Sequence, residues 1–520
     1  MNYKLLGRIL GKIMIMESIL MILPLIISFA YREPIINKIA FIVPIVALSL
    51  LGVLMQLPKL KRTSLYQKEG FALVGLVWIV MTVFGAIPFV INKDIPNYID
   101  ACFEIMSGFT TTGASIVNDV TALAYSTLFW RSFSHWIGGM GILVFVLIFI
   151  PESNDGSSMH LLRAESPGPS VGKIASKMKV TARILYLIYF CLTALEVIVL
   201  LCGPMINHEA LVSAGFDSFE GNKLFYALLT AFGSAGTGGF GFIPNSLEFF
   251  TPFAQYTVSI FLLLFGCNFG LYYLILIGKI KSVLKSEEFR TYFSIVFVAV
   301  TLVFISLVVK LSDVYTIEES FRHSLFQIAS LVTTTGYSTT NFNMWPEFTK
   351  MILVILMFTG AMAGSTAGGI KLSRFVIAFK GSYVNVRKLI NPRYVPKAKF
   401  ESKSLEEKTT NDVFSFITMY LFLLILSTLI LSIDPVNGST IVISSDLGTE
   451  TVKHGFFSNF SSALSCLSNI GPGFEGIGPY SSFANYSWFS KIVMTLLMLI
   501  GRLEILPVLI LFTPRTWKKI

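Results

Sequence analysis

The chain has 520 residues, of which 54% are hydrophobic and only 13% are charged. Soluble domains carry about 25% charged residues, so this composition excludes an ordinary globular enzyme, a disordered chain and a coiled coil. The formal net charge is +10, from 40 Lys and Arg against 30 Asp and Glu. Because the apolar residues form long runs, the sequence predicts a polytopic membrane protein with positively charged cytoplasmic loops, and no nucleic-acid partner.

Ten apolar segments are long enough to cross a bilayer, which takes roughly 20 residues as a helix. The first follows Lys4, Arg8 and Lys12, but it is too long for a signal peptide and ends without a small-residue cleavage site. We therefore expect an all-α protein with about ten transmembrane helices. Their approximate ranges are 10–30, 39–57, 70–91, 128–150, 182–203, 253–278, 292–310, 349–379, 412–432 and 485–513.

The connecting segments alternate in charge along the chain. Segments 92–127 and 204–252 hold more Asp and Glu than Lys and Arg. Lysine and arginine are instead concentrated in four other loops, 58–69, 151–181, 279–291 and 380–411. The positive-inside rule then predicts that the basic loops and both chain termini are cytoplasmic.

From residue 70 onward, each outward segment follows one plan, in which a short half-helix leads into a turn rich in Gly, Thr, Ser and Asn. The half-helices are predicted at 98–112, 223–237, 320–335 and 455–470. Each turn ends on a glycine, and the residue six positions earlier is always small: Ser107 and Gly113, Gly233 and Gly239, Ser330 and Gly336, Ser465 and Gly471. The chain therefore repeats helix, half-helix, turn and helix four times.

These four turns predict a pore. Irregular backbone at membrane depth is tolerated only where it is buried in protein or lines a wet path. Four turns can converge on one axis, where their carbonyl oxygens replace the hydration shell of a monovalent cation. Glycine permits the unusual backbone conformations that point carbonyls inward. One such turn would be interpreted as an external loop, but four in register favour a cation pore.

Other motifs carry little chemistry. Two G-x-G-x-x-G matches, at 236–241 and 471–476, follow no predicted strand, so a dinucleotide site is not expected. The Walker-like run at 364–371 has Ile370 where a lysine is required. The five cysteines and five histidines are scattered, so the sequence predicts no disulfide framework, metal cluster or covalently bound cofactor.

The apolar segment 349–379 is too long for one simple crossing and has a glycine-rich interruption at 360–369. Such unwinding typically marks an ion path or a gate, whereas close packing through small residues is the alternative. Because Lys371 and Arg374 bound its cytoplasmic side, we favour a gate formed by Gly364, Ser365, Thr366, Ala367, Gly368 and Gly369. Arg502 lies within another apolar segment, where arginine is costly and usually functional.

Together with His135–Gly141, Leu162–Pro169 and Gly501–Glu504, the four turns resemble the Trk/Ktr/HKT superfamily of cation transporters over essentially the whole chain. The likeness is greatest to the membrane subunits of bacterial Trk potassium uptake systems, because two helices precede residue 60. It implies two extra N-terminal helices (1–60) and then four M1-pore-M2 repeats in a pseudo-fourfold arrangement, at 61–160, 161–285, 286–390 and 391–520.

The resemblance implies a potassium selectivity filter. Its ion-binding residues would be Thr111, Thr112, Gly113, Gly238, Gly239, Thr334, Thr335, Gly336, Asn469, Ile470 and Gly471. Gly113 favours potassium, because sodium-selective plant relatives carry serine at that position. The fourth turn departs from the Thr-Thr-Gly form of the first and third. The 360–369 segment corresponds to the family's intramembrane gating loop, with Arg502 near it.

The resemblance also implies a homodimer in the bacterial inner membrane that binds a cytosolic nucleotide-binding regulatory subunit of TrkA type. The basic loop 380–411 offers a docking face, although contact with anionic lipid explains its charge equally well. We expect gated, channel-like potassium uptake. Proton- or sodium-coupled symport stays open, with Glu104 and Glu475 near the turns as coupling groups. A membrane enzyme is not expected, because no catalytic cluster is evident.

Overall fold

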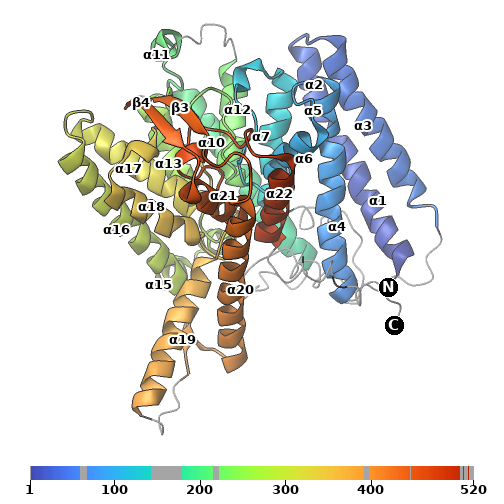
Figure 1. Ribbon diagram of the computed structural model, residues 1–520. Helices are drawn as coiled ribbons and strands as arrows, with labels where there is room; N and C mark the ends of the chain where they lie inside the picture. Colours follow the sequence, from blue (N-terminus) through green and yellow to red (C-terminus); the bar gives the residue numbers. More distant parts are fainter. Residues whose placement is uncertain are drawn as a thin grey trace.

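The computed structural model describes residues 2–58, 67–141, 178–214, 222–391, 397–445 and 447–503, together with Val508 and Thr513. It is predominantly helical, with long helices around a centre of shorter ones (Figure 1). The prediction of an all-α polytopic membrane protein is confirmed. The sequence pattern does not predict two small antiparallel hairpins, which pair β1 (Lys399–Phe400) with β2 (Lys403–Ser404) and β3 (Thr440–Ser445) with β4 (Gly448–Lys453).

Two N-terminal spans precede the repeats. The first consists of α1 (Tyr3–Leu20) and α2 (Ile22–Ala30), and the second is α3 (Ile35–Leu54). Helices α1 and α3 cross at Gly11 and Gly52, which face each other. A β-carbon at Gly11 would lie 2.7 Å from the carbonyl oxygen of Gly52, and one at Gly52 would lie 2.7 Å from that of Gly11. Small residues therefore let the two backbones touch, as in other membrane helix pairs.

Four repeats of one plan follow. The first contains α4 (Gln67–Gly85), α5 (Ile87–Ile91), α6 (Tyr98–Phe109) and α7 (Tyr125–Gly139). The second contains α10 (Met178–Cys202), α11 (His208–Ser213), α12 (Lys223–Gly236), α13 (Pro252–Phe265) and α14 (Phe269–Leu276). After α15 (Ile280–Lys285), the third contains α16 (Glu287–Lys310), α17 (Ile317–Val332), α18 (Glu347–Phe358) and α19 (Leu372–Ile390). The fourth contains α20 (Glu407–Leu431), α21 (Phe456–Ser468) and α22 (Trp488–Leu503). Short 3-10 turns lie at Val120–Ala122, Phe342–Met344 and Glu475–Ile477.

Within the described residues, six helical segments are long and apolar enough to cross a membrane. They are the two N-terminal spans and the first helix of each repeat. The second helices are short or broken. The segment 349–379 is interrupted between α18 and α19, as predicted. The continuous helix predicted over 253–278 is wrong, because α13 and α14 meet at 90°. Residues 142–150 and most of 504–513 lie outside the described part.

The four half-helices α6, α12, α17 and α21 begin and end within a few residues of their predicted limits. Polar caps start three of them. The side chains of Asn97 and Asn222 accept backbone N–H groups of α6 and α12, and Thr316 forms a capping box with Glu319 on α17. Each half-helix packs against the second helix of the preceding repeat, in the pairs α12 with α7, α17 with α13, α21 with α18, and α6 with α22. This order closes the four repeats into a ring.

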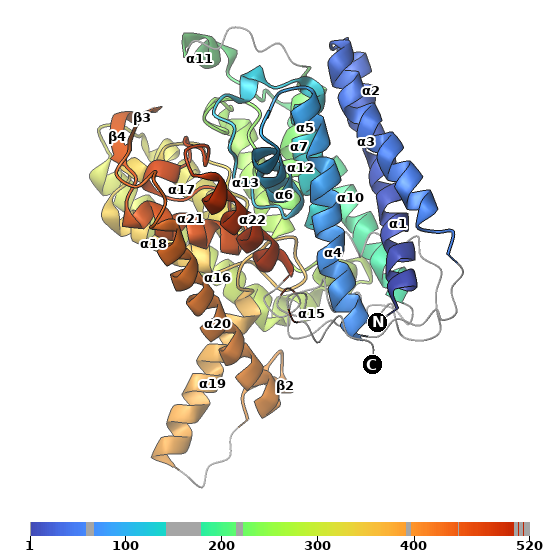
Figure 2. The same cartoon turned by 45° about the vertical axis from the view of Figure 1, so that its right-hand side comes forward.

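An arm leaves the body at one end. It consists of α19, the first turns of α20 and the β1–β2 hairpin, and it projects away from the bundle in both views (Figures 1 and 2). The arm contains most of the basic loop 380–411, and α1 begins at the same end of the molecule. A common side for the basic loop and the N-terminus agrees with the charge pattern, and its placement in the cytoplasm stays a prediction.

Replacing Gly52 with valine should separate α1 from α3, because the added side chain meets a backbone carbonyl that cannot move aside. We expect a loss of about 1–3 kcal/mol in stability, measured as a lower unfolding temperature of the detergent-solubilised protein. The matched control is Gly7→Val on α1, where an added β-carbon meets nothing within 4 Å. Equal melting of the two variants would contradict the close crossing.

Candidate functional site

The four turns share one backbone conformation. The residue two positions before each glycine has φ between 54° and 56° in all four repeats: Thr111, Thr237, Thr334 and Asn469. The glycines have φ of 72° to 106°, and the residue between each pair has negative φ. Alternating the sign of φ turns successive carbonyl groups to the same side, as coordination by backbone oxygens requires. Threonine rarely adopts positive φ, so the surrounding structure must hold it there.

Each half-helix ends in the same backbone hydrogen bond, which the residue six positions before the glycine accepts. The N–H group preceding the glycine donates to the carbonyl of that small residue, at 2.8 to 3.0 Å. The pairs are Thr112 with Ser107, Gly238 with Gly233, Thr335 with Ser330 and Ile470 with Ser465. This is the six-to-one bond of a Schellman motif. The hydroxyl of Ser465 also donates to the carbonyl of Gly471 at 2.7 Å.

The turns meet in a closed ring. A β-carbon at each turn glycine would meet the carbonyl oxygen of the residue that precedes the glycine of the next repeat. The pairs run Gly113 with Gly238, Gly239 with Thr335, Gly336 with Ile470, and Gly471 with Thr112. Positive φ and this close approach both require glycine at these positions. The structure therefore brings the predicted filter residues of all four repeats together, and their binding of ions stays a prediction.

The fourth turn departs from the others through Asn469. Asparagine tolerates the left-handed conformation better than threonine does. Its side-chain amide donates to the hydroxyl of Thr112 at 2.9 Å and to the carbonyl of Met498 at 2.9 Å. These two bonds connect the fourth turn to the first turn and to α22. The ring is asymmetric here, because the other three turns carry threonine at this position.

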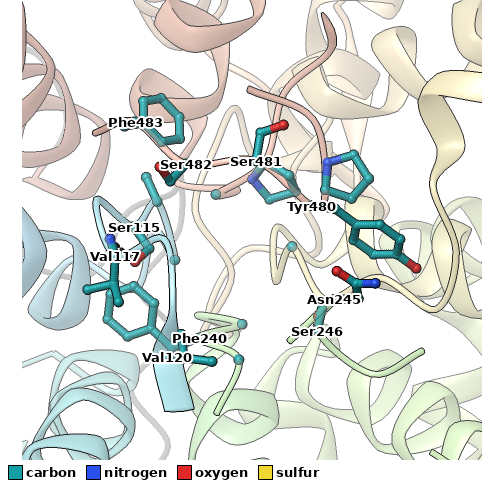
Figure 3. Close-up of a pocket in the computed structure, with 18 of the residues that line it drawn as sticks. Ser115, Val117, Val120, Phe240, Asn245, Ser246, Tyr480, Ser481, Ser482 and Phe483 are labelled. Atoms are coloured by element: carbon teal, nitrogen blue, oxygen red, sulfur yellow. Dashed lines mark hydrogen bonds between the residues drawn. The ribbon is translucent and has the colours of Figure 1, made fainter. Parts of the chain in front are cut away.

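All four glycines line one cavity of about 290 Å³. Its walls come mainly from the chain that follows the first, second and fourth turns, so that Ser115, Ser246 and Ser482 face it in Figure 3. The lining combines hydroxyl and amide side chains with apolar ones such as Val117 and Phe240. Among the described residues that line it, Arg131 is the only one with a charged side chain.

The glycine-rich segment is a loop between α18 and α19. Its base is closed by hydrogen bonds from the N–H of Gly360 to the carbonyl of Ile370 (2.9 Å) and from that of Leu372 to the carbonyl of Ala361 (3.2 Å). Further along the loop, the carbonyl of Gly364 accepts the N–H of Phe269 at 3.0 Å. The buried Lys371 donates to the carbonyl of Ala367. The predicted break therefore forms an ordered loop.

This loop lies directly against the turns. The N–H of Gly368 donates to the hydroxyl of Thr334 at 2.7 Å. A β-carbon at Gly368 would lie 2.6 Å from the carbonyl oxygen of Ser468. Arg502 donates to the loop carbonyl of Thr366 at 2.8 Å.

Arg502 also connects the loop to the first repeat. Its guanidinium donates to the carbonyl of Gly139 at 2.7 Å and to that of Gly138. It therefore holds the loop to the end of α7. The same stretch of α7 packs on the first turn, since a β-carbon at Gly138 would overlap the carbonyl of Phe109. Two other motifs of the resemblance, 162–169 and Glu504, lie outside the described residues.

Sequence reasoning missed two parts of this site. The α13–α14 break at Gly266–Asn268 receives the loop, because the N–H of Met362 donates to the carbonyl of Gly266 at 3.2 Å. A glycine followed by an N-capping asparagine was the available signal. Glu288, at the start of α16, accepts the N–H of Ala363 at 2.8 Å. A carboxylate so far from the loop in sequence gave no signal.

The acidic residues near the turns are engaged in hydrogen bonds. Glu104 pairs with Arg131 at 2.7 Å, and the carboxylate of Glu475 accepts the N–H (3.0 Å) and hydroxyl (2.8 Å) of Ser458. Glu17 and Glu196, within the first helices of the N-terminal region and of the second repeat, are buried without a hydrogen-bond partner among the described residues.

Known proteins share both sequence and fold with this chain. The TrkH family, described as cation transport protein, matches residues 37–519. The Trk system potassium uptake proteins TrkH of Escherichia coli K12 and of Vibrio parahaemolyticus are 32% and 30% identical, over the whole of both chains. The crystal structure of the potassium transporter TrkH from Vibrio parahaemolyticus matches with a TM-score of 0.81 at 28% identity, covering both chains completely. The chain therefore belongs to the TrkH family of cation transport proteins.

Proposed function

We propose that this protein takes up potassium across the bacterial cytoplasmic membrane through a channel-like pore. The observation that carries the proposal is the closed ring of four turns, each with the same alternating backbone and each ending on glycine. The full-length relatives are potassium uptake proteins by name, and transport proteins rather than enzymes. The protein acts as a multi-pass membrane component, with both termini in the cytoplasm.

Coordination by the turn carbonyls is the proposed basis of selection. The ion-binding residues are those of the four turns, from Thr111–Gly113, Gly238–Gly239, Thr334–Gly336 and Asn469–Gly471. Carbonyl oxygens carry partial negative charge without a titratable group, so they replace water around a monovalent cation. The half-helices direct their C-terminal ends, with partial negative charge, toward the same ring.

The loop at 364–369 is the proposed gate, with Arg502 as its tether. Three contacts support this assignment. The loop bonds to the third turn at Thr334, packs on the end of α21, and accepts a hydrogen bond from Arg502 of α22. The hydrogen bonds that hold this loop lie outside the hydrogen-bonded turns of α18 and α19, so the loop can move without unfolding either helix. Movement of this loop would therefore open the path below the filter.

Coupled transport is the weaker alternative. It needs an ionisable group that exchanges ions or protons along the path. The two carboxylates nearest the turns are Glu104 and Glu475, and each is engaged in hydrogen bonds that its ionised form accepts.

We also propose a homodimer that binds a cytosolic nucleotide-binding subunit of TrkA type, for which the basic arm at 380–411 offers positive charge.

Gly113→Ser should weaken discrimination against sodium. The added side chain overlaps the carbonyl of Gly238 and must displace it, so that the ring no longer fits potassium. We expect the ratio of potassium to sodium flux to fall about tenfold, as loss of roughly 1.4 kcal/mol of discrimination would cause. The control is Gly7→Ser on α1, outside the ring of turns, where a β-carbon meets nothing within 4 Å. An unchanged ratio in Gly113→Ser would count against the filter assignment.

Deleting residues 361–368 should raise basal conductance, because the deleted segment is the proposed gate and lies against the turns at Thr334 and Ser468. Ion flux into liposomes without any added partner measures this directly. A silent or unchanged pore would contradict the gate.

A point variant tests the same gate without shortening the chain. Glu288→Ala removes the acceptor of the Ala363 N–H and should also raise basal flux, by a smaller factor. Glu287→Ala is the matched control, because the neighbouring carboxylate pairs with Lys380 instead of with the loop.

A further inference from the structure

We propose that Glu104 neutralises Arg131 at the outer mouth of the pore, and that this pair sets the concentration of cations that reaches the filter. The inference rests on the proposed function, because it assumes that ions reach the turns through the cavity that Arg131 lines. Both residues are positioning residues, since they act on the potential and geometry around the ion path.

The pair is almost completely buried and fully bonded. The side chains of Arg131 and Glu104 are 2% and 0% exposed. Two guanidinium nitrogens contact one carboxylate oxygen, Nε at 2.8 Å and Nη2 at 2.7 Å. The other carboxylate oxygen accepts the N–H of Ile116 at 2.9 Å. The hydroxyl of Ser115, on the cavity wall, bonds to both partners.

Arg131 also reaches the second repeat. Its guanidinium carbon lies 4.3 Å from the centre of the Phe240 ring, and Nη1 donates to the carbonyl of Gly241 at 3.2 Å. Phe240 and Gly241 directly follow the second filter glycine, and both line the cavity. The guanidinium therefore lies between the outer chain segments of the first two repeats, on the side from which cations would enter.

A guanidinium at this position opposes cation transport unless its charge is cancelled. Glu104 supplies the cancelling charge from behind the cavity wall. Its equivalents, nine residues before the turn glycine in the other repeats, are the neutral residues Thr230, Gln327 and Ser462. The pair is thus an asymmetric feature of the first repeat. A pair of opposite charges leaves the mouth close to neutral, so that an incoming ion reaches the hydroxyl and amide groups of the wall without meeting a net positive charge.

Opposite single substitutions test the pair. Glu104→Gln leaves the guanidinium uncompensated, and we expect KM for potassium to rise about tenfold, with a smaller change in Vmax. Arg131→Gln leaves the carboxylate uncompensated and should lower KM. The double substitution removes both charges and should return KM to within about twofold of the unaltered protein, which also keeps the test valid if one single variant folds poorly.

Two further measurements separate electrostatics from structure. Raising the external concentration of an impermeant salt should reduce part of the KM increase of Glu104→Gln, because salt ions screen the guanidinium only where it lines the cavity. The control pair is Asp100–Lys491, which joins α6 to α22 at 2.9 Å but does not line the cavity. Asp100→Asn should leave KM unchanged.

The proposal is overturned if both single variants shift KM in the same direction, or if the double variant does not restore it. It is equally overturned if Asp100→Asn behaves like Glu104→Gln. Failure of the proposed function is distinguishable, because it would show as absent gradient-driven potassium flux in the unaltered protein. Normal flux with KM insensitive to these charges would contradict only the role of the pair.

Discussion

The structure depends on holding non-helical backbone inside a membrane protein, at four places that meet on one axis. Unpaired backbone groups in hydrocarbon cost several kcal/mol each, so such turns survive only where protein and a wet cavity surround them. Here carbonyl groups in the last turn of each half-helix accept hydrogen bonds from the N–H groups of the turn that follows. The carbonyl before each turn glycine packs against the turn glycine of a neighbouring repeat. The long first helices form the wall, while the short and broken second helices leave room for the turns.

A hydrogen bond joins the proposed filter to the proposed gate, which would link selection to opening. The hydroxyl of Thr334 belongs to the third turn and accepts the loop N–H of Gly368. Arg502 of α22 bonds both to the loop and to the end of α7, which supports the first turn. Displacing the loop would therefore break its bond to the third turn. The fourth turn has asparagine in place of threonine, and its side-chain amide donates hydrogen bonds to Thr112 and Met498, which lie close to it.

Much of this could be predicted from sequence, because the determining features are local. The four turns followed from a glycine with a small residue six positions before it, and the half-helices followed from the short stretch that precedes each turn. The 360–369 break followed from its composition. Features that depend on tertiary contact could not be predicted. Glu104 and Arg131 are 27 residues apart with no pattern to join them, and Gly266–Asn268 is hidden in an apolar run. The order of the ring follows only from which helices pack together.

The most direct test is potassium flux through the purified protein in liposomes, with the membrane voltage set by a known gradient. A channel-like pore predicts potassium-preferring flux that follows the electrochemical gradient and needs neither a proton nor a sodium gradient. Flux that appears only when one of those gradients is imposed would contradict a channel-like pore, and it would place the driving chemistry on ionisable groups rather than on the ring of carbonyls.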